Sequence, residues 1–112
     1  MMKKYIVVKL QHEALHHWPG CPHDDVGFLR DKHRHMFHIT LWVEVNHSDR
    51  DIEFIRFKRE IQEYLKDRYD LGQTSCEMLG EELLEKFDCM AVQVMEDDEN
   101  GGLVARDEWR MS

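Results

Sequence analysis

The sequence predicts an α+β fold in which two pairs of strands flank a pair of helices. Apolar and polar residues alternate in two segments near each end of the chain, which is the period of half-buried strands. Between them, apolar residues recur at spacings of three and four, as in amphipathic helices. A chain of 112 residues, 42% of them hydrophobic, has the size of one domain. We therefore expect a single domain over residues 1–112, with an antiparallel sheet in ββααββ order and both helices on one face.

The two N-terminal strands are predicted at Lys4–His12 and His33–Val45. In the first strand the apolar side chains share one face, and the same alternation continues as far as His16. The second strand has thirteen alternating positions and is the clearest element of the sequence. The segment between them, 18–27, holds both prolines and two glycines, which predicts a long loop.

Two helices are predicted in the middle of the chain. Residues 52–54 extend a strand before the first helix, which covers 55–69 and places its apolar side chains on one face. The second helix continues to about Lys86. Its start carries a capping-box pattern with Thr74 as the N-cap and Glu77 three residues later.

The C-terminal strands are predicted at 90–95 and at 103–109. The segment 96–102 between them is acidic and ends in two glycines, which is typical of a hairpin connection. These two strands complete the predicted sheet.

Composition excludes several classes of protein. Fifteen lysines and arginines face 23 acidic residues, a net charge of −8, so we expect no nucleic-acid partner. No apolar run is long enough to span a bilayer, and the N-terminus lacks the apolar core of a signal peptide, so we expect no membrane partner. The three cysteines, an odd number, favour reduced thiols and a cytoplasmic location.

The histidines are distributed unevenly along the chain. All eight lie between His12 and His47, whereas 19 of the 23 acidic residues lie from Glu44 onward. In a strand, His33 and His35 point to the same face about 7 Å apart and can bind one ion. Three neutral imidazoles around Zn²⁺ leave a fourth coordination position open for a ligand. Spacing alone is equally compatible with a solvated strand end.

The third metal ligand has to come from another element. The first strand ends in His16 and His17, which point to opposite faces if the strand continues. We therefore expect at most one of these two histidines to join His33 and His35.

Five segments, in order, resemble motifs of the 6-pyruvoyl-tetrahydropterin synthase and 6-carboxy-tetrahydropterin synthase family. The family motifs are F-S-A-A-H-R, H-G-H-N-Y, V-M-D-F-x-x-L-K, P-T-x-E-N and V-x-V-x-E-T. The corresponding segments here are HEALHH at 12–17, HRHMF at 33–37, DIEFIRFK at 51–58, TSCEM at 74–78 and VQVMED at 92–97. The resemblance implies the T-fold (tunnelling fold), in a short, divergent member similar to phage-encoded relatives.

The resemblance also implies a site and an assembly. His16, His33 and His35 correspond to the zinc ligands of the family, and Glu96 to the carboxylate that anchors the pterin. A carboxylate accepts the adjacent N–H donors of a 2-amino-4-oxo pyrimidine edge in a bidentate pair. Glu77 lies near the same pocket in the family, although its role as a helix cap is already sufficient. A trimer or hexamer of identical chains is implied as well.

The sequence departs from the family at its acid–base residues. Residues 27–32, just before His33, contain no cysteine, and no histidine follows His47 to form the usual Asp–His pair. We therefore expect a zinc-containing T-fold protein that binds a pterin, a purine or a nucleotide without the standard synthase activity. Sequestering a nucleotide signal would be the purpose of such a binding protein.

An enzyme is the alternative. A zinc-dependent lyase or synthase of pterin or 7-deazaguanine biosynthesis would need a substituted base, since proton transfer requires a positioned group. Cys21, Asp24, Asp25 and Asp31 are the candidates that the sequence offers.

Overall fold

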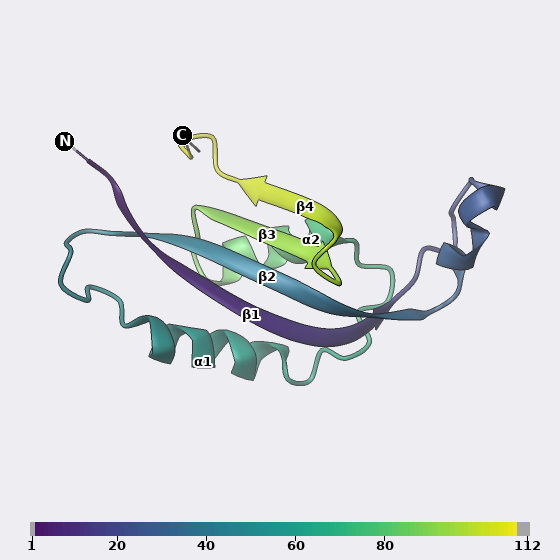
Figure 1. The fold of residues 1–112 in the computed structure, drawn as a ribbon, viewed down its shortest axis with the longest axis horizontal. Helices are drawn as coiled ribbons and strands as arrows, with labels where there is room; N and C mark the ends of the chain where they lie inside the picture. The colour runs from purple at the N-terminus through teal and green to yellow at the C-terminus, as the bar shows by residue number, and fades with distance from the viewer. Residues whose placement is uncertain (1, 110–112) are drawn as a thin grey trace.

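A computed structural model describes residues 2–109 and has an α+β architecture (Figure 1). Four antiparallel strands form one sheet in the spatial order β1-β2-β3-β4, so each strand is hydrogen-bonded to its neighbour in the sequence. The elements along the chain are β1 (Lys4–His16), the 3₁₀ helix η1 (Asp24–Arg30), β2 (His33–Val45), α1 (Phe54–Leu65), α2 (Cys76–Lys86), β3 (Ala91–Glu96) and β4 (Asn100–Ala105). The predicted α+β class and antiparallel sheet are confirmed.

The two longest strands form a hairpin that is paired over its whole length. Lys4 lies opposite Val45 at one end, and His16 lies opposite His33 at the other. The continued alternation in the sequence therefore marked a real extension of β1 beyond His12. The segment that joins the strands projects beyond the end of the sheet in Figure 1. The long loop predicted there is wrong in part, because η1 occupies its second half.

Both helices pack on one side of the molecule and enclose the core. α1 runs alongside β1, and α2 lies against β3 and β4 (Figure 1). Apolar side chains from α1, α2 and one face of the sheet are buried between these layers. Both helices lie on this face, so no helix of residues 2–109 covers the opposite face of the sheet. The most deeply buried large side chains are Phe37, Ile39, Leu41, Ile61, Leu65, Leu79, Leu83, Val92 and Val94.

The predicted bounds of the first helix are wrong at both ends. Residues 52–54 form no strand, since α1 begins at Phe54 behind Glu53, whose carboxylate accepts a hydrogen bond from the Ile55 amide. The helix ends at Leu65 rather than at residue 69. Its amphipathic spacing continues further, but the backbone leaves the helix to join the end of β1.

The segment after α1 attaches to the free edge of β1. The Leu15 amide donates to the Tyr69 carbonyl oxygen at 2.7 Å, and the Leu71 amide donates to the Leu15 carbonyl oxygen at 2.8 Å. These bonds form a short parallel bridge between Leu15 and Asp70. The helix therefore ends before this segment, because the backbone groups of residues 69–71 form hydrogen bonds with β1 instead of continuing the helix.

The predicted capping box is wrong by one residue. Ser75 is the N-cap of α2, and its hydroxyl accepts the Met78 amide at 3.1 Å. The Thr74 hydroxyl instead donates to the Leu71 carbonyl oxygen at 2.6 Å. Glu77 lies in the first turn of α2, where a carboxylate favours the positive end of the helix.

The C-terminal hairpin is tighter than the sequence predicts. β4 begins at Asn100 and ends at Ala105, so the acidic connection shrinks to a short turn after Glu96. Asp97 and Asp98 both have positive φ angles, 52° and 58°. These left-handed residues reverse the chain at once and bring the Asp97 side chain back toward β2. The predicted strand at 103–109 therefore starts too late and runs too far.

Candidate metal centre

Three histidines meet at one end of the sheet, on the face that the helices cover. His16 ends β1, and His33 and His35 begin β2. Their rings contact one another, with centroids 4.5 Å apart for His16 and His33 and 5.0 Å for His33 and His35. The antiparallel register explains the meeting, because it places His16 opposite His33 while His35 follows on the same face.

The Nδ1 atom of each histidine is within hydrogen-bond distance of a protein oxygen. In a neutral imidazole, an Nδ1–H that donates to oxygen leaves Nε2 free to bind a metal, and such partners orient histidine ligands in metal sites. The acceptors are the Thr74 carbonyl for His16 (2.9 Å), the Asp31 carbonyl for His33 (2.8 Å) and the Asp97 carboxylate for His35 (2.6 Å). All three rings are therefore held from one side, with Nε2 turned toward the centre of the cluster.

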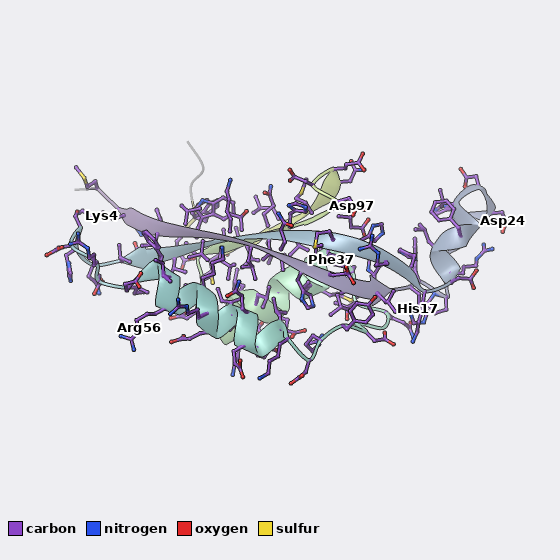
Figure 2. All side chains as sticks on the ribbon, turned by 60° about the horizontal axis from the view of Figure 1, so that its bottom comes forward. Lys4, His17, Asp24, Phe37, Arg56 and Asp97 are labelled. Carbon is purple, nitrogen blue, oxygen red and sulfur yellow. The ribbon has the colours of Figure 1, made fainter. Side chains whose placement is uncertain are left out.

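Glu96 brings a carboxylate to the same place from β3. It lies opposite Phe37 of β2, so its side chain shares the covered face with the histidines. Glu96 Oε2 is 2.8 Å from His16 Nε2, and Oε1 is 3.6 Å from His35 Nε2. Figure 2 shows Phe37 and Asp97 on the half of the molecule remote from Lys4.

The four side chains have the composition and spacing of a metal site. His16, His33, His35 and Glu96 each offer one ligand atom, and these atoms lie within 4.8 Å of one another. The Nε2 atom of His33 is buried and has no hydrogen-bond partner among the described residues. A buried polar atom without a partner is costly, and a metal ion would satisfy it. Imidazole nitrogens with a carboxylate oxygen suit zinc.

Electrostatic contacts within the cluster favour charged side chains. Contact with the Glu96 carboxylate raises the pKa of His16, although desolvation acts in the opposite direction. The same contact lowers the pKa of Glu96. A hydrogen bond from the Met36 amide lowers the pKa of Asp97, and the bond from His35 adds to this effect. The oxygen that holds His35 is thus a carboxylate at neutral pH.

His17 and Glu77 do not join the four-residue cluster. The His17 ring is turned toward the Gly72 carbonyl oxygen, 3.1 Å from Nδ1. It points away from the cluster because it directly follows His16, the last residue of β1, and consecutive residues along a strand face opposite sides. Glu77 lies against the C-terminal hairpin, since a Cβ atom at Gly102 would stand 2.8 Å from its Cγ. Glu77 is next to Cys76, whose thiol also interacts with Glu96.

Sequence reasoning missed the oxygens behind the histidines and the thiol beside Glu96. Two of the three oxygens, those of Asp31 and Thr74, are backbone carbonyls, which carry no signature in the sequence. Asp97 is adjacent to Glu96, and this adjacency was the one available signal. Burial, with smaller contributions from Glu96 and Glu77, raises the pKa of the Cys76 thiol to about 12.

Fold and site together define an α+β protein with a three-histidine, one-carboxylate candidate metal centre at one end of its sheet. No protein-family model matches the sequence, and no curated protein matches it. Among residues 2–109, no helix is both long enough and apolar enough to cross a membrane.

Proposed function

We propose that this chain is a zinc-containing T-fold protein that binds a pterin- or purine-like small molecule, nucleotides included, without the standard synthase reaction. The proposal rests on the convergence of His16, His33, His35 and Glu96, the residues that the family resemblance assigns to zinc and pterin. Sequestration of a nucleotide signal is the biological role that fits such a binding protein.

The histidines and the carboxylate have separate roles in this proposal. His16, His33 and His35 hold the zinc through Nε2, with Nδ1 fixed by the oxygens behind them. A zinc ion with three imidazoles has a fourth position for a ligand oxygen or nitrogen, whose charge it stabilises. Glu96 accepts the adjacent N–H donors of the pyrimidine edge, and its lowered pKa keeps it an acceptor at neutral pH.

Two of the candidate bases for a lyase or synthase, Cys21 and Asp24, are poorly suited to proton transfer. Cys21 is buried, and its thiol donates to the His23 carbonyl oxygen. Asp24 forms an ion pair with Arg30 on the projecting segment. Cys76 lies near the site, but a thiol with a pKa of about 12 stays protonated at neutral pH. These features favour a binding protein over the enzyme.

Metal content tests the first half of the proposal. Protein prepared without chelator should contain about one zinc per chain, as a single three-histidine site holds one ion. The double variant His33→Ala, His35→Ala should lose it. The matched control removes two histidines outside the cluster, His38→Ala and His47→Ala, and should keep the zinc. Full occupancy in the first variant would refute the assignment of the site.

Co-purified ligand tests the second half. Protein denatured after gentle purification should release a molecule with the absorbance and mass of a pterin or purine. Glu96→Gln should weaken rebinding of that molecule, because an amide N–H would face the ligand's own donors at a cost of about 1–3 kcal/mol. Turnover of dihydroneopterin triphosphate at ordinary enzyme rates would instead establish the enzyme.

Assembly is a further part of the proposal. β1 and β4 are the edges of the sheet, and proteins normally pair or cover such edges. Within residues 2–109, the end of β1 is covered at Leu15 by the segment after α1. A trimer or hexamer would pair the edges of neighbouring chains. Sedimentation equilibrium at micromolar concentration should show an oligomer, and a monomer would contradict the proposal.

A further inference from the structure

The molecule has a recess whose lining residues differ from those of the histidine cluster. It is a pocket of about 510 Å³ that involves β1, β2 and β3 together with side chains of α1 and the turn after β3. None of the four cluster residues lines it. Its volume falls within the range of small-molecule binding sites, roughly 300–1,000 Å³.

The sheet contributes polar side chains from its uncovered face. Lys9 lies opposite Thr40, and Thr40 lies opposite Gln93, so these three form one row across three strands. Gln11 and His38 form the next row. Each of these residues alternates with core residues of its strand, so its side chain points away from the core. The rows together present one ammonium, one imidazole, one hydroxyl and two amides.

Helix α1 adds a second ammonium to the same pocket. Lys58 and Gln62 stand four residues apart on α1, one turn from each other, and both line the pocket. Asp98, in the turn after β3, is its one acidic lining residue. The local charge is therefore positive, in a chain whose net charge is −8.

Among the described residues, the two lysines of the pocket have no ion-pair partner. Eight lysines and arginines of the described residues form ion pairs with carboxylates. Within residues 2–109, Lys9 and Lys58 form none, and no hydrogen bond holds Gln11, Gln62 or Gln93. The recess therefore offers two unpaired ammonium groups and several free hydrogen-bond donors, in a chain rich in acids. Such groups can bind a multiply charged oxyanion.

We infer that this pocket binds the phosphate group of a phosphorylated small molecule. Lys9 from β1 and Lys58 from α1 contact the phosphate oxygens from two sides, and the glutamine amides donate to the remaining oxygens. Asp98 accepts a hydrogen bond from a hydroxyl or amino group on the rest of the ligand. The site lies on different side chains from the proposed zinc site and does not depend on it.

Titration with inorganic pyrophosphate, followed by calorimetry and by NMR of the backbone amides, tests this inference. The wild type should bind at millimolar concentration or below, with shifts at Thr40 and Gln93. Lys9→Gln, Lys58→Gln should weaken binding at least about tenfold, which corresponds to about 1.4 kcal/mol. The control Arg56→Gln, Arg59→Gln makes the same charge change on the helix that carries Lys58, outside the pocket, and should alter affinity less than about twofold.

The His33→Ala, His35→Ala variant separates this site from the metal centre. Pyrophosphate binding that survives in this variant supports the pocket, whereas binding lost with the metal would place the anion on zinc and overturn the inference. Equal weakening by the pocket and control variants would show general charge attraction only, and would overturn it too. Absence of wild-type binding at millimolar pyrophosphate would also overturn the inference.

Discussion

The two faces of the sheet use the same strands for different purposes. On the covered face, β1, β2 and β3 supply the apolar core and then, at one end, the histidines and Glu96. On the uncovered face, the intervening residues present two amides, a hydroxyl, an imidazole and one ammonium group to the pocket. Leu10 is 6% exposed, while its neighbours Lys9 and Gln11 are exposed. One register therefore fixes both sites, since side chains alternate along each strand.

The faces differ in how firmly their polar groups are held. Each cluster histidine has an oxygen behind its Nδ1, and these oxygens come from three separate connections outside the strands. Of the strand residues of that face that line the pocket, Lys9, Gln11 and Gln93 have no such partners within the described chain. A preorganised cluster suits a metal ion with strict geometry, whereas a pocket of long, unpaired side chains suits a ligand that it contacts through adjustable hydrogen bonds.

The largest difference between the faces should be in stability. Leu83 of α2 is fully buried in the core, so Leu83→Ala should lower the free energy of unfolding by about 2–5 kcal/mol through lost burial and the cavity left behind. Thr40→Ala, on the uncovered face, should cost less than about 1 kcal/mol. Urea denaturation measures both. Similar losses for the two variants would mean that the open face is buried in solution.

The second prediction concerns the oxygen behind His35. Asp97→Ala removes the carboxylate that orients this ring and should weaken zinc binding about 10- to 100-fold. Asp98→Ala is the matched control, because it changes the neighbouring residue of the same turn, also at positive φ. Competition with a fluorescent chelator gives both affinities. Equal loss in the two variants would attribute the effect to the turn backbone rather than to His35.

A smaller effect is expected at the start of α2, next to Thr74, whose carbonyl holds His16. Ser75→Ala removes the N-cap hydroxyl and should cost about 1 kcal/mol of unfolding free energy. Ser75→Asp supplies another good N-cap and should retain the stability. Thermal or urea unfolding of both variants measures the two unfolding free energies. If Ser75→Ala is neutral, the cap lies elsewhere, as the Thr74 capping box predicted.

The sequence was most informative where one pattern decides the structure. β2 has the predicted bounds because all thirteen residues alternate, and an antiparallel neighbour then places His16 beside His33. The antiparallel pairing of β2 with β3 likewise places Glu96 on the same face. Strand periodicity alone predicted that His33 and His35 share a face, whereas the choice of His16 and Glu96 came from the family resemblance.

Features that depend on tertiary contacts could not be predicted. The spacing that continues α1 to Tyr69 is real, but pairing with Leu15 takes the backbone away from the helix. Thr74 and Ser75 are both competent N-caps, and the choice depends on where the chain must pass beside β1. The pocket is lined by scattered, mostly polar residues of the sheet, α1 and the turn after β3, a combination without any local motif.

The smallest expected effect is a pH dependence in protein from which metal has been removed by chelation. The pKa of His16 is raised above its ordinary 6.5, so its contribution to stability is complete below 6.5 and is lost as the pH rises through the raised value. The pKa of Glu96 is lowered below its ordinary 4.5, so its contribution is complete above 4.5 and is lost as the pH falls through the lowered value.

The stability difference between the chelated wild type and Glu96→Gln should therefore be largest between these two ordinary values and shrink on either side. Glu99→Gln, in the turn after β3, is the control and should show no such maximum. Saturating zinc should move the maximum to higher pH, because the metal competes with protons for the imidazoles. Urea denaturation across the pH range gives the three curves. A difference that stays constant with pH would show that Glu96 and His16 do not interact in solution, and would separate the carboxylate from the covered-face cluster.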